Sequence, residues 1–194
     1  MMEGLASQAA VPKTVMIDVE PGGRHWSENH WRGYLKAHRT ATSLRVKKGG
    51  SDDQHGRLIG RTKGGMNTKL HAVTDADGRP IRFFMTAGQV SDYTGAAALL
   101  GSLPAAEWLL GDRGYDADWF RDALKDKGIK PCIPGRKSRS KPVRYDKRRY
   151  KRRNRIEIMF GRLKDWRRVA TRYDRCPKVF LSAVALAATV KFWL

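Results

Sequence analysis

The chain has 194 residues, and its 39 Lys and Arg residues against 19 Asp and Glu give it a formal net charge of +20. A chain of this length buries one core, so we expect one domain, and the excess positive charge indicates a polyanionic partner, with nucleic acid favoured over a membrane surface. The apolar run at residues 179–194 is shorter than the roughly 20 apolar residues of a membrane span, so it predicts a buried helix. Cys132 and Cys176 have neither zinc nor disulfide spacing, which fits a reducing cytoplasm.

One short strand stands out among unpatterned segments in the first third of the chain. Residues 1–13 have no periodicity and predict a disordered tail. Residues 14–18 (TVMID) predict a strand that ends in the carboxylate of Asp18. Residues 19–33 predict a loop insertion, and the Gly- and Lys-rich residues 45–67 predict a mobile basic loop.

The middle of the chain contains a clear hairpin signal. Residues 69–75 (KLHAVTD) alternate into a strand, and residues 80–86 (PIRFFMT) return as its partner. Asp77 and Gly78 between them are typical turn residues. These features predict two antiparallel strands.

Helices and short strands alternate after the hairpin. Ser91 and Asp92 can cap a helix, and the strand predicted at residues 107–112 (EWLLGD) ends in Asp112. Asp116 can cap the next helix, and a further short strand, a Lys- and Arg-rich loop and two helices complete the chain. This order predicts an α/β fold in which helices flank a mixed sheet.

A long basic helix is predicted near the C-terminus. Apolar residues recur at helical spacing in residues 156–166, so one face of this helix should pack on the sheet. Tyr150, Arg153, Glu157 and Lys164 follow one another at intervals of three, four and seven residues, which places them near one line on another face. The simplest interpretation of Glu157 is an (i, i+4) ion pair with Arg153. The alternative is a metal ligand on a helix that follows DNA phosphates.

Asp112 favours the metal interpretation. It follows a buried strand, at the place where α/β sheets bind their ligands, and Asp18 ends another apolar strand. Carboxylates from separate elements can share hard divalent cations, and a pair of such ions can act on both oxygens of a phosphodiester exchange. We therefore expect Asp18, Asp112 and Glu157 to bind two Mg²⁺ ions, with Mn²⁺ as the substitute ion.

Other polar residues near the predicted sheet have simpler roles. His71 is expected to be a hydrogen-bonded strand histidine rather than a catalyst. Asp75, Asp77 and Asp92 could support a metal site, but turn and capping roles explain them more simply.

The chain resembles the DDE-type insertion-sequence transposases of the IS-five-like group. The similarity covers roughly residues 34–194, and the signature helix of that family has Tyr, two residues, Arg, three residues, Glu, six residues and Lys. Tyr150, Arg153, Glu157 and Lys164 satisfy every interval. The other matching motifs are YLKAHRTATSL, GRTKGGMNTKLHAV, GQVSDYTGAAALL, LLGDRGYDADWFRDAL and IKPCIPGRKSR.

The resemblance implies an RNase H-like catalytic domain over residues 14–194. It implies that Asp112 is the second acid of a catalytic triad and Glu157 the third, with Asp18 as the candidate for the first. In that family the first acid lies only three residues before the tyrosine of a segment similar to YLKAHRTA. Here residues 19–33 separate Asp18 from that segment.

The implied activity is metal-dependent cleavage of insertion-sequence ends followed by strand transfer into target DNA. Tyr150, Arg153 and Lys164 would position the backbone of double-stranded DNA, at both the terminal inverted repeats and the target. The resemblance also implies a DNA-binding partner or fusion encoded in an upstream reading frame, a homo-oligomer on DNA, and a place in the bacterial cytoplasm at the nucleoid. A metal-dependent nuclease and a catalytically impaired DNA-binding remnant remain as alternatives.

Overall fold

The computed structural model describes residues 12–19, 35–42, 55–62 and 65–194, and its centre is one mixed sheet. Along the sheet the strands follow the order β7 (Lys130–Cys132), β6 (Trp108–Leu110), β1 (Thr14–Val19), β4 (Gly65–Thr74), β2 (Leu35–Ala37) and β8 (Thr171–Arg172). Two further strands, β3 (Gly60–Thr62) and β5 (Pro80–Ala87), also pair with β4. β6 runs parallel to both β1 and β7, whereas β4 is antiparallel to β1 and β5, so the expected α/β class with a mixed sheet is confirmed.

The predicted hairpin is present as β4 and β5, joined by a turn at Asp75–Arg79. The Asp75 carboxylate accepts hydrogen bonds from the backbone nitrogens of Asp77 at 2.9 Å and Arg79 at 2.8 Å. Gly78 has a φ of 83°, and a Cβ there would lie 2.9 Å from the carbonyl oxygen of Arg155. This turn therefore requires glycine at position 78.

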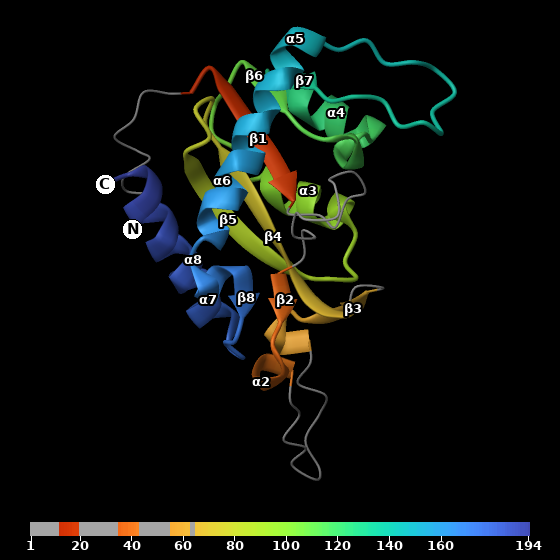
Figure 1. Ribbon diagram of the computed structural model, residues 1–194. Helices are drawn as coiled ribbons and strands as arrows, with labels where there is room; N and C mark the ends of the chain where they lie inside the picture. Colours follow the sequence, from red (N-terminus) through yellow and green to blue (C-terminus); the bar gives the residue numbers. More distant parts are fainter. Residues whose placement is uncertain (1–11, 20–34, 43–54, 63–64) are drawn as a thin grey trace.

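Helices cover both faces of the sheet, with α6 and α8 on one side and α3 and α4 on the other (Figure 1). The α-helices are α2 (Arg39–Thr42), α3 (Asp92–Leu100), α4 (Asp118–Asp126), α5 (Lys147–Tyr150), α6 (Asn154–Lys164), α7 (Arg167–Ala170) and α8 (Pro177–Phe192). Three short 3₁₀ turns are η1 (His55–Arg57), η2 (Arg113–Tyr115) and η3 (Lys151–Arg153). The predicted basic helix therefore runs through α5, η3 and α6, with a tighter turn in its middle.

The two faces of the sheet belong to two apolar clusters. Along β1, Met16 packs into the cluster of α6 and α8, whereas Val15 and Ile17 pack into the cluster of α3 and α4. Because successive side chains of a strand point to opposite faces, Asp18 lies on the same face as Met16. Asp18 is only 3% exposed, so a buried carboxylate faces α6.

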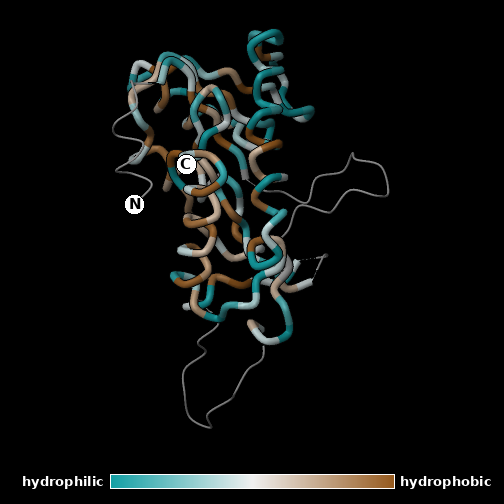
Figure 2. Tube along the Cα trace, turned by 60° about the vertical axis from the view of Figure 1, so that its left-hand side comes forward, coloured by the Kyte–Doolittle hydropathy of each residue, from teal (hydrophilic) through white to brown (hydrophobic). Residues whose placement is uncertain are grey.

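The apolar stripe predicted for the basic helix is confirmed, whereas α8, which was predicted to be buried, is buried on one face only. Ile156, Met159, Phe160 and Leu163 of α6 are buried. α8 buries one face through residues such as Phe180, while residues on its other face are exposed. Figure 2 shows hydrophobic and hydrophilic residues alternating along the helical turns, as expected for helices with one buried face. Among the described residues, no helix is both long and apolar enough to cross a membrane.

Two local predictions require correction. Residues 55–62 and 65–67, which fall within the predicted mobile loop, form η1, β3 and the start of β4, because β3 pairs with β4 from Gly60↔Asn67 to Thr62↔Gly65. Asp116 does not cap α4, whose N-cap is Ala117. The predicted tail up to residue 11, the insertion from residue 20, and residues 45–54 and 63–64 of the basic loop lie outside the described residues.

The side chain of Arg172 at β8 is fully buried and joins three segments of the chain. Its guanidinium donates hydrogen bonds to Thr68 Oγ1 at 2.7 Å and to the carbonyl oxygens of Arg57 at 2.7 Å, Asp174 at 2.9 Å and Arg175 at 3.0 Å. Burial lowers the pKa of Arg172 to about 10, so it remains protonated at neutral pH. This network ties the segment before α8 to β4.

His71 makes the stability of the fold depend on pH. The ring is buried, stacks on Phe84 with 4.2 Å between ring centroids, and shares a hydrogen bond with Thr86 Oγ1 at 2.8 Å. Burial, helped by the charge of Lys69, lowers the pKa of His71 from 6.5 to about 3. Between these values the unfolded chain binds a proton that the folded chain does not, so stability falls as pH drops through this window.

We expect the His71 contribution to reduce the free energy of unfolding by about 1.4 kcal/mol for each pH unit below about 6.5. Urea unfolding of wild type and His71→Gln at several pH values isolates this slope, because the variant lacks the group that titrates. NMR titration of the His71 ring provides a second measurement. A ring that titrates near its ordinary pKa would contradict the prediction.

Candidate active site

Asp18 and Asp112 meet at one edge of the sheet. β1 and β6 are parallel neighbours, so their carboxyl ends lie at the same edge. Asp18 is the penultimate residue of β1 and lies opposite Ala72 of β4, while Asp112 follows the end of β6 by two residues. The structure thus places Asp112 at the end of its buried strand, as predicted.

The Asp112 carboxylate is fixed by the turn that follows it. Its Oδ1 accepts a hydrogen bond from the backbone nitrogen of Gly114 at 2.7 Å. A Cβ at Gly114 would lie 2.8 Å from Asp112 Oδ1 and 3.4 Å from Asp92 Oδ2, so glycine leaves the space that both carboxylates need. Burial raises the pKa of Asp112, Arg153 and the Gly114 hydrogen bond oppose the rise, and Asp92 adds to it.

The side chain of Arg153 contacts two of the carboxylates. Its guanidinium donates to Asp18 Oδ2 at 2.6 Å and also pairs with Glu157, one helical turn further along the same helix. The predicted (i, i+4) pair is therefore present, but Arg153 additionally reaches across to β1. Burial disfavours the charged guanidinium, yet the surrounding carboxylates and Tyr150 hold the pKa of Arg153 above its usual value.

Two tyrosines border this group. The guanidinium of Arg153 lies 5.8 Å from the ring centroid of Tyr150, whose pKa is raised mainly by burial. The hydroxyl of Tyr115 is buried and has no hydrogen-bond partner within the described residues. Burial, followed by the charges of Asp18, Asp112 and Asp92, raises the pKa of Tyr115 well above its usual value.

The structure thus brings together five of the six predicted site residues. Arg153 links them: it pairs with Asp18 and Glu157 and interacts electrostatically with Asp112 and Tyr150. The sixth residue is Lys164, the last residue of α6. Its backbone lies seven residues beyond Glu157, which is about 10 Å along the helix axis.

The carboxylates supply the oxygen ligands that Mg²⁺ and Mn²⁺ prefer. Among the described residues, no three His, Cys, Asp or Glu side chains are grouped closely enough to hold one metal ion. The arrangement instead places the Arg153 cation in contact with Asp18 and Glu157 and in electrostatic interaction with Asp112. A positive charge is therefore already stabilised between Asp18 and Glu157.

Another carboxylate, that of Asp116, anchors the basic loop beside the site. Its buried carboxylate accepts from Arg121 Nε at 2.8 Å, the backbone nitrogen of Arg136 at 2.7 Å and Arg139 Nε at 3.0 Å. Burial opposes ionisation, but these hydrogen bonds hold the pKa of Asp116 below its usual value. One carboxylate thus fixes three basic residues in place.

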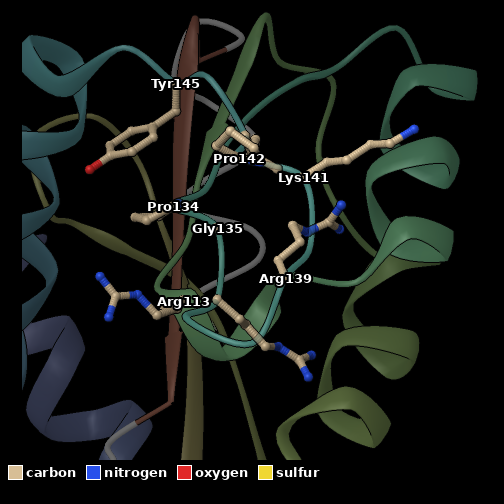
Figure 3. A pocket seen from close by; sticks show the side chains of 9 residues that line it. Arg113, Pro134, Gly135, Arg139, Lys141, Pro142 and Tyr145 are labelled. Atoms are coloured by element: carbon tan, nitrogen blue, oxygen red, sulfur yellow. The ribbon is translucent and has the colours of Figure 1, made fainter.

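The anchored loop forms a pocket of about 280 Å³ next to η2. Figure 3 shows Arg113 reaching it from the turn after β6, whereas Arg139, Lys141 and Tyr145 come from the loop between β7 and α5. The pocket is therefore lined by cations from two segments, one of which directly follows Asp112 in the chain. Such a surface can attract a phosphate backbone towards the carboxylates.

Sequence reasoning missed two of these features. Asp92 was assigned to helix capping, but it pairs with Lys69 at 2.8 Å and its second oxygen faces Gly114. Asp116 was assigned to a cap and instead anchors the basic loop. Both contacts join residues that are about 20 positions apart in the sequence, so no local sequence pattern predicts them.

Comparison with known proteins gives one family and two relatives. Residues 41–190 match the family model described as "Transposase DDE domain". A Brucella ovis protein named "Putative transposase for insertion sequence element IS6501" is 38% identical over 131 residues, which cover 66% of this chain and 99% of the relative. A Burkholderia cepacia protein named "Putative transposase for insertion sequence element IS402" is 36% identical over 101 residues, which cover 42% of this chain and 48% of the relative.

The contact between Asp18 and Arg153 can be tested without any substrate. We expect a double-mutant cycle of Asp18→Asn and Arg153→Met, measured by urea unfolding, to give a favourable coupling of about 1 to 3 kcal/mol, because both side chains are largely buried. The matched control is the exposed pair of Arg155 and Asp77, whose coupling should stay below about 1 kcal/mol. Equal coupling in the two cycles would show that Arg153 is not the internal cation described above.

Proposed function

Since this chain belongs to the family of DDE-type insertion-sequence transposases, we propose that it cuts DNA at the ends of an insertion sequence and joins the freed ends to target DNA. Asp18, Asp112 and Glu157 are the acids that we assign to this reaction. The metal is Mg²⁺, with Mn²⁺ as the substitute ion, and we place the chain in the IS-five-like group.

The observation that carries the proposal is the convergence of three carboxylates around one cation. Asp18 comes from β1, Asp112 from the turn after β6, and Glu157 from α6, yet all three interact with Arg153. Carboxylates that come from elements far apart in the sequence and interact with one cation mark a candidate functional site. Cation binding is the use that fits their oxygen chemistry.

The sheet supports an RNase H-like assignment for the domain. β5, β4, β1, β6 and β7 lie side by side, with β4 antiparallel and β6 parallel to the central β1. Two of the acids come from the carboxyl edge of the parallel pair, and the third comes from a helix that packs on one face of the sheet.

Divalent ions bound by the carboxylates would supply activation of the attacking oxygen and stabilisation of the leaving oxygen during phosphoryl transfer. The chain itself provides the positioning. Asp112 is held by Gly114, and Asp18 is held against β4, so their orientations are fixed before substrate arrives. Tyr150, Arg153 and Lys164 are proposed to contact the DNA backbone.

The partners in this proposal are double-stranded DNA at the terminal inverted repeats and at the target, a DNA-binding region from an upstream reading frame, and further copies of the chain. The high net positive charge supports binding to DNA. A metal-dependent nuclease without strand transfer would cut but never join. A catalytically impaired remnant would bind DNA without cutting it.

Removal of either assigned acid should stop the chemistry but not the binding. We expect Asp112→Asn and Glu157→Gln to reduce Mg²⁺-dependent cleavage of a labelled terminal-repeat duplex by at least about 10³-fold, because bound metal supplies several kcal/mol of transition-state stabilisation. Affinity for the same duplex should stay equal or rise slightly, since each change removes negative charge near phosphate.

Asp122→Asn is a suitable control, because Asp122 is an exposed carboxylate of α4 that pairs with Lys125 at 2.8 Å. It should leave cleavage unchanged. All variants belong in a chain fused to its upstream-frame region, so that delivery of DNA does not limit the rate. Full cleavage by either active-site variant would remove that acid from the proposal.

Binding should depend strongly on salt. If the basic segment from residue 136 to residue 172 meets about six phosphates, affinity for the duplex should fall by about 10³-fold between about 50 and 200 mM salt, because binding releases condensed counterions. Fluorescence anisotropy across this range measures the slope. An affinity independent of salt would rule out phosphate contacts as the main source of binding.

A further inference from the structure

Two hollows adjoin along the loop between β7 and α5. The smaller is the pocket of about 280 Å³ next to η2, and the larger is an open groove of about 670 Å³ between that loop and the start of α3. Arg113 and Arg136 line both of them. The two hollows therefore form one concave surface, which we call the loop groove.

The loop groove is strongly cationic. Its lining contains one carboxylate, that of Asp92, and the cations Lys69, Arg113, Arg136, Lys137, Arg139 and Lys141. Lys69 pairs with Asp92 at 2.8 Å, so the single carboxylate is already neutralised. Within the described residues, the side chains of Arg113, Lys137 and Lys141 have no ion-pair partner. These three side chains leave uncompensated positive charge in the groove.

A buried acid holds the wall of the loop groove in place. Asp116, whose side chain is only 1% exposed, accepts hydrogen bonds from the backbone nitrogen of Arg136 at 2.7 Å and from Arg139 Nε at 3.0 Å. Arg139 and Lys141 project from this loop (Figure 3), and Arg139 also pairs with Asp118 of α4. Because the loop is already anchored, binding of a ligand does not have to order it.

The loop groove leads to Asp112. Gly114 lines the groove, and its backbone nitrogen donates to Asp112 Oδ1 at 2.7 Å, while Arg113 directly follows Asp112 in the chain. The groove adjoins α3, which packs on one face of the sheet, whereas α6, which carries Glu157, packs on the other. A DNA strand that passes Asp112 can therefore contact the groove on one side and α6 on the other.

We propose that the loop groove binds consecutive phosphates of one DNA strand next to Asp112, and that Arg113, Lys137 and Lys141 neutralise them. The proposal rests on the function proposed above, and it adds a DNA contact surface separate from the helix that runs through α5, η3 and α6. A polynucleotide is the anion that fits, because the uncompensated cations line two adjoining hollows and can each meet a different phosphate.

Fluorescence anisotropy with a DNA duplex, in buffer without divalent metal, tests the proposal. We expect the triple variant Arg113→Gln, Lys137→Gln and Lys141→Gln to bind more weakly than wild type. Its plot of log affinity against log salt concentration should be shallower by about 2 to 3 in slope, because each lost phosphate contact removes about 0.9. The change should be equal for terminal-repeat and unrelated sequences, since phosphate contacts carry no sequence information.

The matched control is the triple variant Lys13→Gln, Lys127→Gln and Lys178→Gln. These lysines are exposed and line neither hollow, yet their replacement removes the same total charge. The control slope should change by less than about 1. The double variant Lys137→Gln and Lys141→Gln leaves the turn after β6 intact, so it guards against misfolding of the triple variant, and its slope should fall by about 2.

Lysine acetylation followed by mass spectrometry locates the contact without any substitution. Bound duplex should slow the acetylation of Lys137 and Lys141 in the wild-type chain, because phosphates would cover their ammonium groups. Lys127 and Lys178 should react at the same rate with and without DNA.

Three results would overturn the proposal: no binding of duplex by the wild type, equal slopes for the wild type and the groove variants, or an equal loss in the control triple. Unchanged acetylation of Lys137 and Lys141 would overturn it as well. A shallower slope in the groove variants with no DNA cleavage by the wild type would support the loop groove and refute the transposition chemistry. Cleavage by the wild type with an unchanged slope in the groove variants would do the reverse.

Discussion

The arrangement of the carboxylates at the carboxyl edge of the sheet depends on one guanidinium, that of Arg153, which compensates their negative charge. Asp18 is almost fully buried, and removing an ion from water costs several kcal/mol unless the charge of a partner offsets that cost. Arg153 offsets part of the cost for three carboxylates at once. The helix that carries Arg153 must therefore lie where it does, with its 3₁₀ turn next to β1, or the acids would have no common counter-charge.

Ordinary backbone rules bring these groups together. The parallel pairing of β1 and β6 places Asp18 and Asp112 at one edge, and strand alternation turns Asp18 towards α6. The four-residue spacing in the helix aligns Arg153 with Glu157. Close packing then needs glycine at two points, since a Cβ at Gly114 would strike Asp112 and a Cβ at Gly95 of α3 would lie 2.4 Å from the His71 ring.

The features predicted correctly from sequence were those with a local signature. Alternation identified the hairpin, helical spacing identified the buried stripe of α6, and an apolar run located Asp112 at a strand end. The strands β2, β3 and β8 have only two or three residues, too few for a pattern. β2 and β3 form by pairing with the long strand β4, and β8 forms by pairing with β2. The same limit applies to Arg172, whose partners Arg57 and Thr68 lie more than 100 positions away.

At the site, the charge of the protein surface changes from positive to negative over a short distance, and this change affects how a phosphate could approach. The basic loop held by Asp116 and the exposed Lys and Arg residues can attract phosphate, whereas the site itself presents Asp18, Asp112 and Glu157. Arg153 pairs with two of these carboxylates, Asp18 and Glu157. A phosphate that follows the basic surface to this point would meet repulsion unless additional cations accompany it. The carboxylates that are costly to bury at this edge thus favour cations over bare phosphate.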